Sequence, residues 1–407
     1  MPSLKPLPDC EGPKLEAFTD DLFAHDVEFL SINFAGDDGL HSQIFKTMID
    51  GKLYCLKMFT VNHSFLSPDS HIISEKTYEY VKRQPEDVQA LVRMQTTGFQ
   101  NECRAYGRLR ETGLEHLAGK VYGYVQFRAD DERYERLYWA CEDKNKSTYN
   151  CTNPYERRSI PRAWIGRPDK DDKPDPRPAV GIVKEWLGRS DVGNSDDGDY
   201  AVTKTRLDQL PQMLRDLHEL HRIGIVNRDL NSNHYVDGLL CDFSSAWTIP
   251  HALGPDGGVL PSSAFASMAA FDLWRFQTIV IEDHNYWAAQ DPRETRKAPC
   301  RLRAYPAYPR RWTETRPPKP IPNRGDRLKT LRHMAHRHGP FLPMLDGDED
   351  TWTENFIAWP KHDPAAFDWK GTHVAAEEMA EGGRGTPAGE SRKRQKQAGG
   401  SQRKRAR

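Results

Sequence analysis

Residues 225–247 read Ile-Val-Asn-Arg-Asp-Leu-Asn-Ser-Asn-His-Tyr-Val-Asp-Gly-Leu-Leu-Cys-Asp-Phe-Ser-Ser-Ala-Trp. This stretch places Asp229 and Asp242 on either side of Asp237-Gly238, a dipeptide that favours the two-residue turn of an antiparallel hairpin. Two carboxylates a hairpin apart suit phosphoryl transfer, in which one orients the attacking hydroxyl and the other holds the metal on the phosphates. Taken alone, the pair is more typical of turn aspartates that cap local backbone.

A single lysine, Lys57, interrupts the apolar run Leu53-Tyr-Cys-Leu-Lys-Met-Phe59. If buried, its ammonium requires a carboxylate or phosphate partner. Residues 99–110 carry apolar side chains at helical spacing with Glu102 at the edge of the stripe, so the pattern predicts that Lys57 pairs with Glu102. Glu75 and Glu79 are alternative partners, because residues 60–98 hold an insertion with its own helix around residues 86–93. The other interpretation is a lysine that reaches the solvent at the sheet edge.

Hydrophobic periodicity outlines the rest of the ordered chain. Alternating patterns predict strands, with Asp50-Gly51 joining the second to the third, over residues 28–34, 43–48, 52–59, 119–127 and 180–187. A leucine stripe predicts a helix over residues 207–220 that ends near Gly224. Prolines make residues 1–25 an irregular lead-in, and the polar residues 128–178 predict a mobile excursion between strands.

These motifs together resemble the protein-kinase fold over about residues 25 to 280, in particular the divergent kinase-like proteins of filamentous fungi. Asn227-Arg-Asp-Leu230 resembles the His-Arg-Asp-Leu catalytic loop, and Asp242-Phe-Ser244 resembles the Asp-Phe-Gly motif. Lys57 resembles the strand lysine that grips the phosphates. Phe271-Asp-Leu-Trp-Arg-Phe276 resembles the start of the large buried helix whose aspartate, here Asp272, braces the catalytic loop.

The resemblance implies an α+β, two-lobed fold with a small, mainly β N-lobe and a mainly helical C-lobe. The implied parts are a lead-in at residues 1–25, an N-lobe at 26–187 with insertions at 60–98 and 128–178, a linker at 188–203, a divergent C-lobe at 204–370 and a disordered basic tail at 371–407.

The resemblance also implies a site for ATP with magnesium or manganese. Asp229 would orient the substrate hydroxyl, and Lys57 with Glu102 would grip the phosphates. The metal ligands would be Asp242 and Asn233. The other expected nucleotide-binding residues are the hinge residues Glu185, Trp186 and Leu187 and the loop glycines Gly36 and Gly39.

The sequence departs from the kinase pattern at several points. His234 stands where kinases keep an asparagine for the second magnesium, and imidazole is a poor ligand for that hard ion. Asn231 and Asn233 are the nearby oxygen ligands that would replace it. Ser244 stands in the place of a glycine, and the loop over residues 36–41 carries two acids that would repel phosphates.

Composition describes a globular but polar chain of 407 residues, 37% of them hydrophobic. No run of about 18 apolar residues is present, and the first residues lack the apolar stretch of a secretory signal, so we expect no membrane association. Seven cysteines without paired spacing predict free thiols in a reducing compartment.

Residues 391–407 carry eight Lys or Arg and no acid, so the remainder of the chain has a formal charge near −9 (−1 − 8). Two basic clusters around a short spacer are typical of a bipartite nuclear import signal. We therefore expect a nuclear or nucleocytoplasmic protein that binds an import receptor through the tail from Arg392 to Arg407. A solvated tail without a receptor is one alternative, and a tail that contacts nucleic-acid phosphates is another.

Three functions agree with these features. The favoured one is a divergent kinase-like phosphotransferase that moves the γ-phosphate of ATP to a protein or small-molecule hydroxyl. The alternative is a pseudokinase that acts as a nucleotide-independent binding scaffold in the nucleus. The third is a nuclear interaction protein that binds through its tail and through the Pro-, Arg- and Trp-rich residues 290–370.

Overall fold

The structure is a computed structural model of the whole chain, which separates into two units, Met1–Trp369 and Lys370–Arg407. It describes residues 7, 10–33, 42–59, 75–128, 131–134, 136–137, 140, 178–187, 209–260, 263–281, 285, 300–304 and 361–371. The predicted features outside the described residues are Gly36, Gly39, the side chains of Asn233 and Glu75, residues 188–203 and the basic tail.

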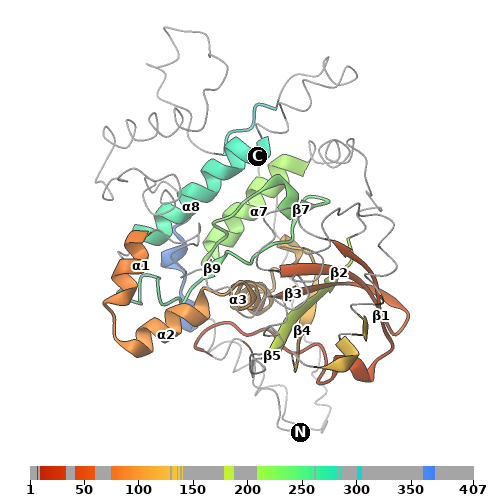
Figure 1. The fold of residues 1–407 in the computed structure, drawn as a ribbon. Helices are drawn as coiled ribbons and strands as arrows, with labels where there is room; N and C mark the ends of the chain where they lie inside the picture. Colours follow the sequence, from red (N-terminus) through yellow and green to blue (C-terminus); the bar gives the residue numbers. More distant parts are fainter. Residues whose placement is uncertain are drawn as a thin grey trace, which may run out of the picture. The chain divides into compact units, whose positions relative to one another are not determined.

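A five-stranded antiparallel sheet forms the first part of the larger unit (Figure 1). Its order is β1-β2-β3-β5-β4, with β1 at Val27–Asn33, β2 at Ser42–Ile49, β3 at Lys52–Phe59, β4 at Val121–Arg128 and β5 at Pro178–Glu185. These strands confirm the five predicted ones, with bounds that differ by two residues or fewer. The α+β class is confirmed as well, because helices follow the sheet along the chain.

Two Asp-Gly dipeptides close hairpins in the same way. Asp50-Gly51 joins β2 to β3, and Asp237-Gly238 joins β7 (Tyr235–Val236) to β8 (Leu239–Leu240). In the two turns φ is 49° and 51° at the aspartates and 73° and 80° at the glycines. A turn with positive φ at both central residues favours Asp-Gly, so the structure confirms both predicted hairpins.

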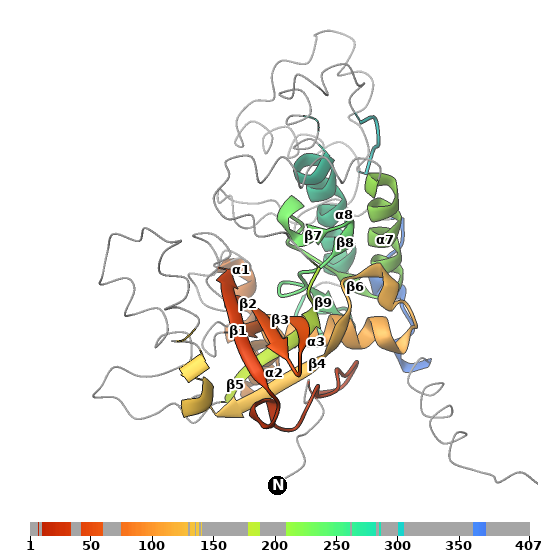
Figure 2. The same cartoon turned by 90° about the vertical axis from the view of Figure 1, so that its right-hand side faces the viewer.

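The helix α3 (Gly98–Glu111) covers one face of the sheet (Figure 2). It begins at Thr97, whose hydroxyl accepts a hydrogen bond from the backbone N–H of Gln100. Phe99 packs edge-to-face on Phe59 of β3 and on Tyr124 of β4. The predicted helix over residues 99–110 is therefore confirmed, and it lies where Lys57 of β3 can reach it.

The opposite face of the sheet is covered too. Phe29, Phe45 and Leu56 form a core there with Tyr134, which is only 2% exposed. Tyr134 belongs to the start of the predicted mobile excursion, and its ring lies 6.0 Å from that of Phe29. This beginning is packed on the sheet, unlike the prediction, because single aromatic side chains in a polar segment leave no periodic pattern.

The irregular lead-in is an integral part of the core. Leu15 is fully buried, and the backbone of residues 16 to 18 pairs with Tyr124 of β4 through Phe18 N to Tyr124 O (2.8 Å) and Tyr124 N to Glu16 O (3.0 Å). This pairing covers the outer edge of β4. The lead-in also runs so close to α3 that a Cβ at Gly107 would lie 2.8 Å from the backbone of Lys14.

The insertion between β3 and α3 folds into a helical hairpin. Its helices are α1 (Glu75–Lys82) and α2 (Glu86–Gln95), and α2 confirms the helix predicted around residues 86–93. Val81 and Val92 are buried in the same apolar cluster as Trp247 and Phe265. The hairpin is thereby joined to the later part of the chain rather than to the sheet.

The remaining elements lie on the other side of α3. They are α7 (Leu210–Arg222), β6 (Ile225–Val226), β9 (Trp247–Thr248) and α8 (Ser263–Arg275), which continues as a π-helical stretch at Phe276–Ile281. Short 3-10 turns occur at Leu22–Ala24, Glu115–Leu117, Ser232–His234 and Pro364–Ala366. Helices α7 and α8 lie side by side (Figures 1 and 2).

The start of α8 corrects one prediction. Residues 271–276 were expected to begin the large buried helix, but they lie at its end, because α8 begins at Ser263. The missed half is rich in alanine and apolar on all sides, with Ala264, Met268 and Ala269 all buried. A helix that is buried all round has no amphipathic stripe to reveal it.

Residues 361–369 belong to the same compact unit as the elements above. Trp369 is 8% exposed, and its indole N–H donates to Asp256 Oδ2 over 3.3 Å. The ring of Phe367 lies 4.3 Å from the guanidinium carbon of Arg108 on α3. This short segment therefore packs on parts of the core that come from much earlier in the sequence.

Two global expectations concern the described residues alone. None of their helices has the length and apolar character needed to cross a bilayer. The described cysteines are all free thiols, as predicted: Cys10, Cys55, Cys103, Cys241 and Cys300. Cys141 and Cys151 lie outside this part of the chain.

Candidate functional site

The predicted ion pair between Lys57 and Glu102 is present at the centre of the molecule. Lys57 Nζ lies 2.9 Å from Glu102 Oε2, and the two side chains are 3% and 0% exposed. The same Nζ lies 2.9 Å from Asp242 Oδ1, which follows β8. The alternative partner Glu79 instead pairs with Lys82. One lysine thus connects the sheet, α3 and the hairpin segment, while its role in gripping phosphates stays a prediction.

A second buried lysine, Lys184 of β5, joins this cluster. Its Nζ donates to Glu102 Oε1 and, over 2.8 Å, to the carbonyl of Cys241. We did not single it out from the sequence. The signal was nevertheless there, because Lys184 ends the apolar run Val180-Gly-Ile-Val much as Lys57 interrupts its own, and the same burial argument applies.

The electrostatics of Lys184 show that its charge is matched. Burial by itself lowers the pKa of a lysine, but the carboxylates of Glu102 and Asp242 outweigh that effect, and the pKa of Lys184 is raised above its ordinary value. Lys184 is therefore a charged side chain that carboxylates stabilise, although it is buried with only 6% of its surface exposed.

Asp272 of α8 braces the loop, as predicted. Its Oδ2 accepts the N–H of Asn227 and its Oδ1 accepts the N–H of Arg228, each over 2.7 Å. The imidazole of His221 lies 3.1 Å from the same carboxylate. Arg228 has φ of 70°, a left-handed conformation that costs a non-glycine residue energy, and the two hydrogen bonds hold it there.

Asn227 links the two aspartates of the hairpin region. Its side-chain oxygen accepts the N–H of Asp229 over 3.2 Å, and its amide group donates to the carbonyl of Asp242 over 2.8 Å. Asp229 is 42% exposed at its side chain and lies 3.2 Å from the guanidinium of Arg275. Asn227 thus fixes the local geometry that the pair of aspartates was expected to show.

The expected hinge and nucleotide residues are placed less favourably. The backbone N–H of Glu185 donates to Lys120 O over 2.9 Å, so it is engaged within the chain. Trp186 is half-buried under Lys46 Nζ, which lies 5.2 Å from its ring centre, and Leu187 packs beside Gly119. Gly36 and Gly39 are outside the described residues.

The predicted metal ligand Asp242 is engaged by other groups of the chain. Among them, no group of three or more His, Cys, Asp or Glu is arranged to hold a metal ion. Asp242 Oδ1 accepts from both Lys57 and the N–H of Ser244, and His234 Nδ1 donates to the carbonyl of Asp229 over 2.7 Å. ATP with magnesium or manganese stays a prediction.

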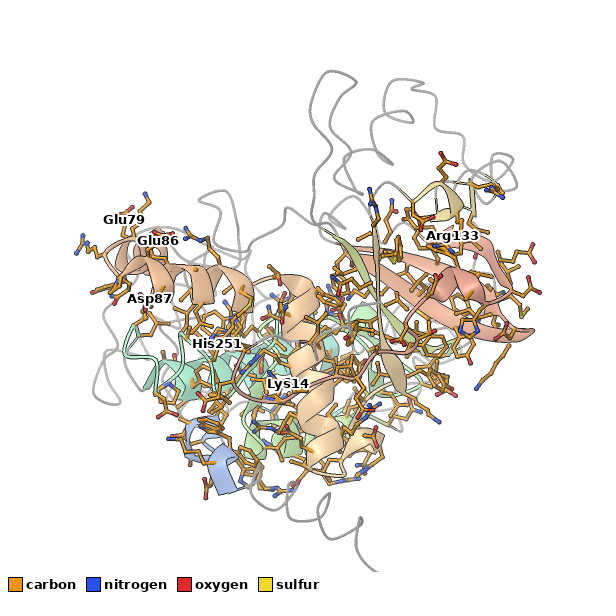
Figure 3. All side chains as sticks on the ribbon, turned by 90° about the horizontal axis from the view of Figure 1, so that it is seen from below. Lys14, Glu79, Glu86, Asp87, Arg133 and His251 are labelled. Carbon is orange, nitrogen blue, oxygen red and sulfur yellow. The ribbon has the colours of Figure 1, made fainter. Side chains whose placement is uncertain are left out.

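Behind the loop, three side chains form a stack that ends at a buried histidine. The guanidinium of Arg228 lies 3.8 Å from the ring centre of Trp247, and the imidazole of His251 stacks on Trp247 with ring centres 4.7 Å apart and an angle of 16° between the planes. His251, which is labelled in Figure 3, donates from Nε2 to Gln95 O at the end of α2 and accepts the N–H of Leu253 at Nδ1, each over 3.1 Å. These two bonds require the neutral imidazole.

We expect this histidine to make the fold sensitive to acid. Burial, with the nearby charges of Arg104 and Arg228, lowers the pKa of His251 well below its ordinary value of 6.5. As the pH falls below about 6.5 the unfolded chain takes up a proton that the folded chain does not, so stability is lost. The loss from this group between pH 7 and pH 5 is about 2 kcal/mol.

Urea unfolding at both pH values measures this loss. His251→Gln should be less stable at pH 7 but show a smaller drop on going to pH 5, and the difference between the two drops is the part due to His251. His116→Gln, at an exposed position, is the control and should leave the drop unchanged. An equal drop in His251→Gln and in the natural protein would contradict the expectation.

Comparison with known families identifies the family of the chain. The model of the kinetochore Sim4 complex subunit FTA2 family matches residues 3–247. The match spans 245 residues (247 − 3 + 1) of 407, which is more than half of the chain. No curated protein matches the chain.

This match corrects the expectation of a protein kinase. The matching family is one of kinetochore subunits, so the kinase-domain, ATP-binding and phosphotransferase assignments drawn from the resemblance are wrong. The physical reason lies in what the motifs report. Asn227-Arg-Asp and Asp242-Phe-Ser describe a braced loop and the segment after a hairpin, which the structure contains, and such a framework carries no chemistry by itself.

Proposed function

We propose that this chain, which belongs to the kinetochore Sim4 complex subunit FTA2 family, is a protein-binding scaffold that works in the nucleus without nucleotide. The observation that carries the proposal is that the charged groups at the centre bind one another. Lys57 and Lys184 are matched by Glu102 and Asp242 within the chain. Such a site has internal partners for its charges, as a stable platform requires.

The arrangement of the scaffold is part of the proposal. In this reading residues 26–187 form an N-lobe around the sheet and α3, and residues 204–370 form a C-lobe around α7 and α8. The buried arginines Arg104 and Arg108 of α3 support a fixed relation between these parts, because their guanidinium groups donate to carbonyls of Thr248, Pro250, Ile223 and Ile249.

The partners of the scaffold follow from the family. Other protein subunits of the kinetochore complex are the proposed partners, and the nucleus is the proposed location. We further propose that the basic tail from Arg392 to Arg407 binds an import receptor. Two other outcomes would contradict this proposal for the tail: that it binds nothing, or that it contacts nucleic-acid phosphates.

The scaffold proposal is tested by affinity purification of the tagged chain from cells that express it naturally. We expect kinetochore proteins to copurify with the natural chain and, to the same extent, with Asp229→Asn, because a scaffold does not use the carboxylate chemically. Asp229 is a suitable site because it is partly exposed and its substitution leaves Asp272 and the loop brace in place. Absence of kinetochore proteins from both samples would sink the proposal, and so would loss of growth in Asp229→Asn with copurification intact.

Nucleotide independence has its own test. The melting temperature of the purified protein is measured with ATP and magnesium, ATP and manganese, and ATP and EDTA, since a ligand that binds only the folded state raises it by mass action. We expect the same melting temperature in all three. A rise that needs the metal would contradict this part of the proposal. Imaging of the tagged chain with and without residues 391–407 tests the import signal.

A further inference from the structure

We propose that Lys184 is an internal counter-ion that keeps the core closed without a ligand. The inference rests on the proposed scaffold function and goes beyond it by naming the group that holds α3 and the segment after β8 together. Lys184 is then a positioning residue, because it acts on Glu102 and on the segment after β8.

The charge balance around Glu102 carries the first step. Glu102 is completely buried, and each of its two oxygens faces one lysine. Lys57 is shared, because Asp242 lies at the same 2.9 Å distance from its Nζ as Glu102 does. Without Lys184, one ammonium would face two carboxylates, and one of them, Glu102, is completely buried. Lys184 brings the cluster to neutrality.

The second step concerns the segment that follows β8. Four hydrogen bonds reach residues 240–244 from β3, from β5, from α3 and from the residue pair before β4. The backbone N–H of Gly119 donates to Leu240 O (3.0 Å), Lys184 to Cys241 O (2.8 Å), Lys57 to Asp242 Oδ1 (2.9 Å) and the side chain of Asn101 to Ser244 O (2.8 Å). This segment, residues 240–244, is therefore attached at nearly every residue.

Packing encloses the same segment. Phe243 is fully buried, and its ring lies edge-to-face on Tyr106 of α3 with centres 5.2 Å apart. Lys184 Nζ lies 5.2 Å from the centre of that same tyrosine ring. Lys184 thus contacts both α3 and the segment 240–244. Loss of these contacts would therefore allow the segment to separate from the helix.

The remaining contacts of α3 fix the helix from its other side. Arg104 donates to Glu11 O in the lead-in and to Thr248 O in β9, and Arg108 donates to Ile223 O and Ile249 O. Both side chains are 0% exposed. Glu102 lies on this anchored helix, so its carboxylate has a fixed position between the two lysines.

Lys184→Met tests the inference, with Lys120→Met as the matched control. Methionine has a similar length without the charge, and Lys120 is exposed beside the ring of Tyr122. Breaking a buried pair should raise amide hydrogen exchange in residues 240–244 and in α3 by roughly 100-fold in Lys184→Met. The control should leave the exchange there unchanged. Should Lys184→Met fail to fold, Lys184→Gln keeps a donor for Cys241 O and should show the same direction.

A double-mutant cycle identifies Glu102 as the partner. Glu102→Gln combined with Lys184→Met should cost less than the sum of the two single changes, because the double variant leaves no unmatched charge between them. Additive losses would overturn the inference, as would an effect of Lys184→Met no larger than that of Lys120→Met. Slowing of exchange in the natural protein by ATP with magnesium would overturn it as well.

These outcomes separate the inference from the scaffold function. The exchange and stability measurements use the purified chain, and they report on Lys184 whether or not kinetochore proteins bind. If kinetochore proteins copurify with neither the natural chain nor its variants, while the exchange result is as expected, the scaffold function is rejected and the internal counter-ion is kept. Normal copurification with unchanged exchange in Lys184→Met would do the reverse.

Discussion

Asp272→Asn is expected to lower the free energy of unfolding by about 3 kcal/mol. The carboxylate is completely buried and accepts two backbone N–H groups, one on each oxygen. Asparagine has nearly the same shape, but its amide group presents a donor to one of those N–H groups. Either Asn227 or Arg228 would lose its acceptor, and a buried unsatisfied donor costs energy.

The loss should be concentrated in the loop. Arg228 keeps its left-handed conformation, with φ of 70°, only while its N–H is held, so we expect amide exchange of the loop to rise more than that of the sheet. Urea unfolding gives the total loss, and exchange gives its location. Asp256→Asn is the control, because Asp256 is an exposed carboxylate that accepts the indole N–H of Trp369, which an amide oxygen can still do. A loss in Asp272→Asn no larger than in this control would contradict the bracing role.

Local turn chemistry was the most predictable part of the fold. Asp50-Gly51 and Asp237-Gly238 require positive φ at both positions, which few dipeptides tolerate, so the sequence determined both hairpins. The five strands followed from alternation. Lys57 and Glu102 were predictable as a pair for a different reason, since a lysine in an apolar strand demands a buried anion.

Contacts made by single residues over long sequence separations were not predictable in this way. Arg104 and Arg108 occupy a helix whose sequence reads as partly polar, yet both are buried, because they donate to backbone carbonyls of segments distant in the chain. A backbone carbonyl has no sequence signature. The packing of Leu15 and of Trp369 escaped prediction for the same reason, as each lies in a segment without periodicity.

Function was the least predictable property, although the motifs were found where the sequence placed them. Asp272 braces the loop, and Asn227 joins Asp229 to Asp242. These contacts stabilise a backbone conformation that a transferase or a binding protein can use equally well. The departures at His234 and Ser244 were the better guide, because a side chain that must contact a ligand is less replaceable than one that holds a turn.

Expressing residues 3–247 alone is expected to yield a chain without a cooperative unfolding transition, even though this is the segment that the family model matches. The segment ends within β9 and lacks α8. Asp272 would be missing from the loop, and the carbonyls of Ile249 and Pro250 would be missing from the buried arginines of α3. Circular dichroism during a urea titration would show a gradual change in place of a single step.

A graded series of truncations locates the end of the folding unit more sharply. A chain ending at residue 360 keeps α8 but loses Phe367, which stacks on Arg108, and Trp369, whose ring is buried among Trp247 and Phe265. Losing a large buried aromatic costs about 3 to 5 kcal/mol, and a typical domain has only about 5 to 15 kcal/mol in total. We therefore expect this chain to be largely unfolded at 37 °C.

A chain ending at residue 371 is the matched control, because it keeps both aromatic residues and removes only the tail. It should unfold at the same urea concentration as the full chain, since the compact unit ends at Trp369. Equal stability of the chains ending at 360 and 371 would show that the C-terminal segment is not needed. A stable fragment of residues 3–247 would show that the matched segment folds without the brace from Asp272, and would place the whole scaffold in the first part of the chain.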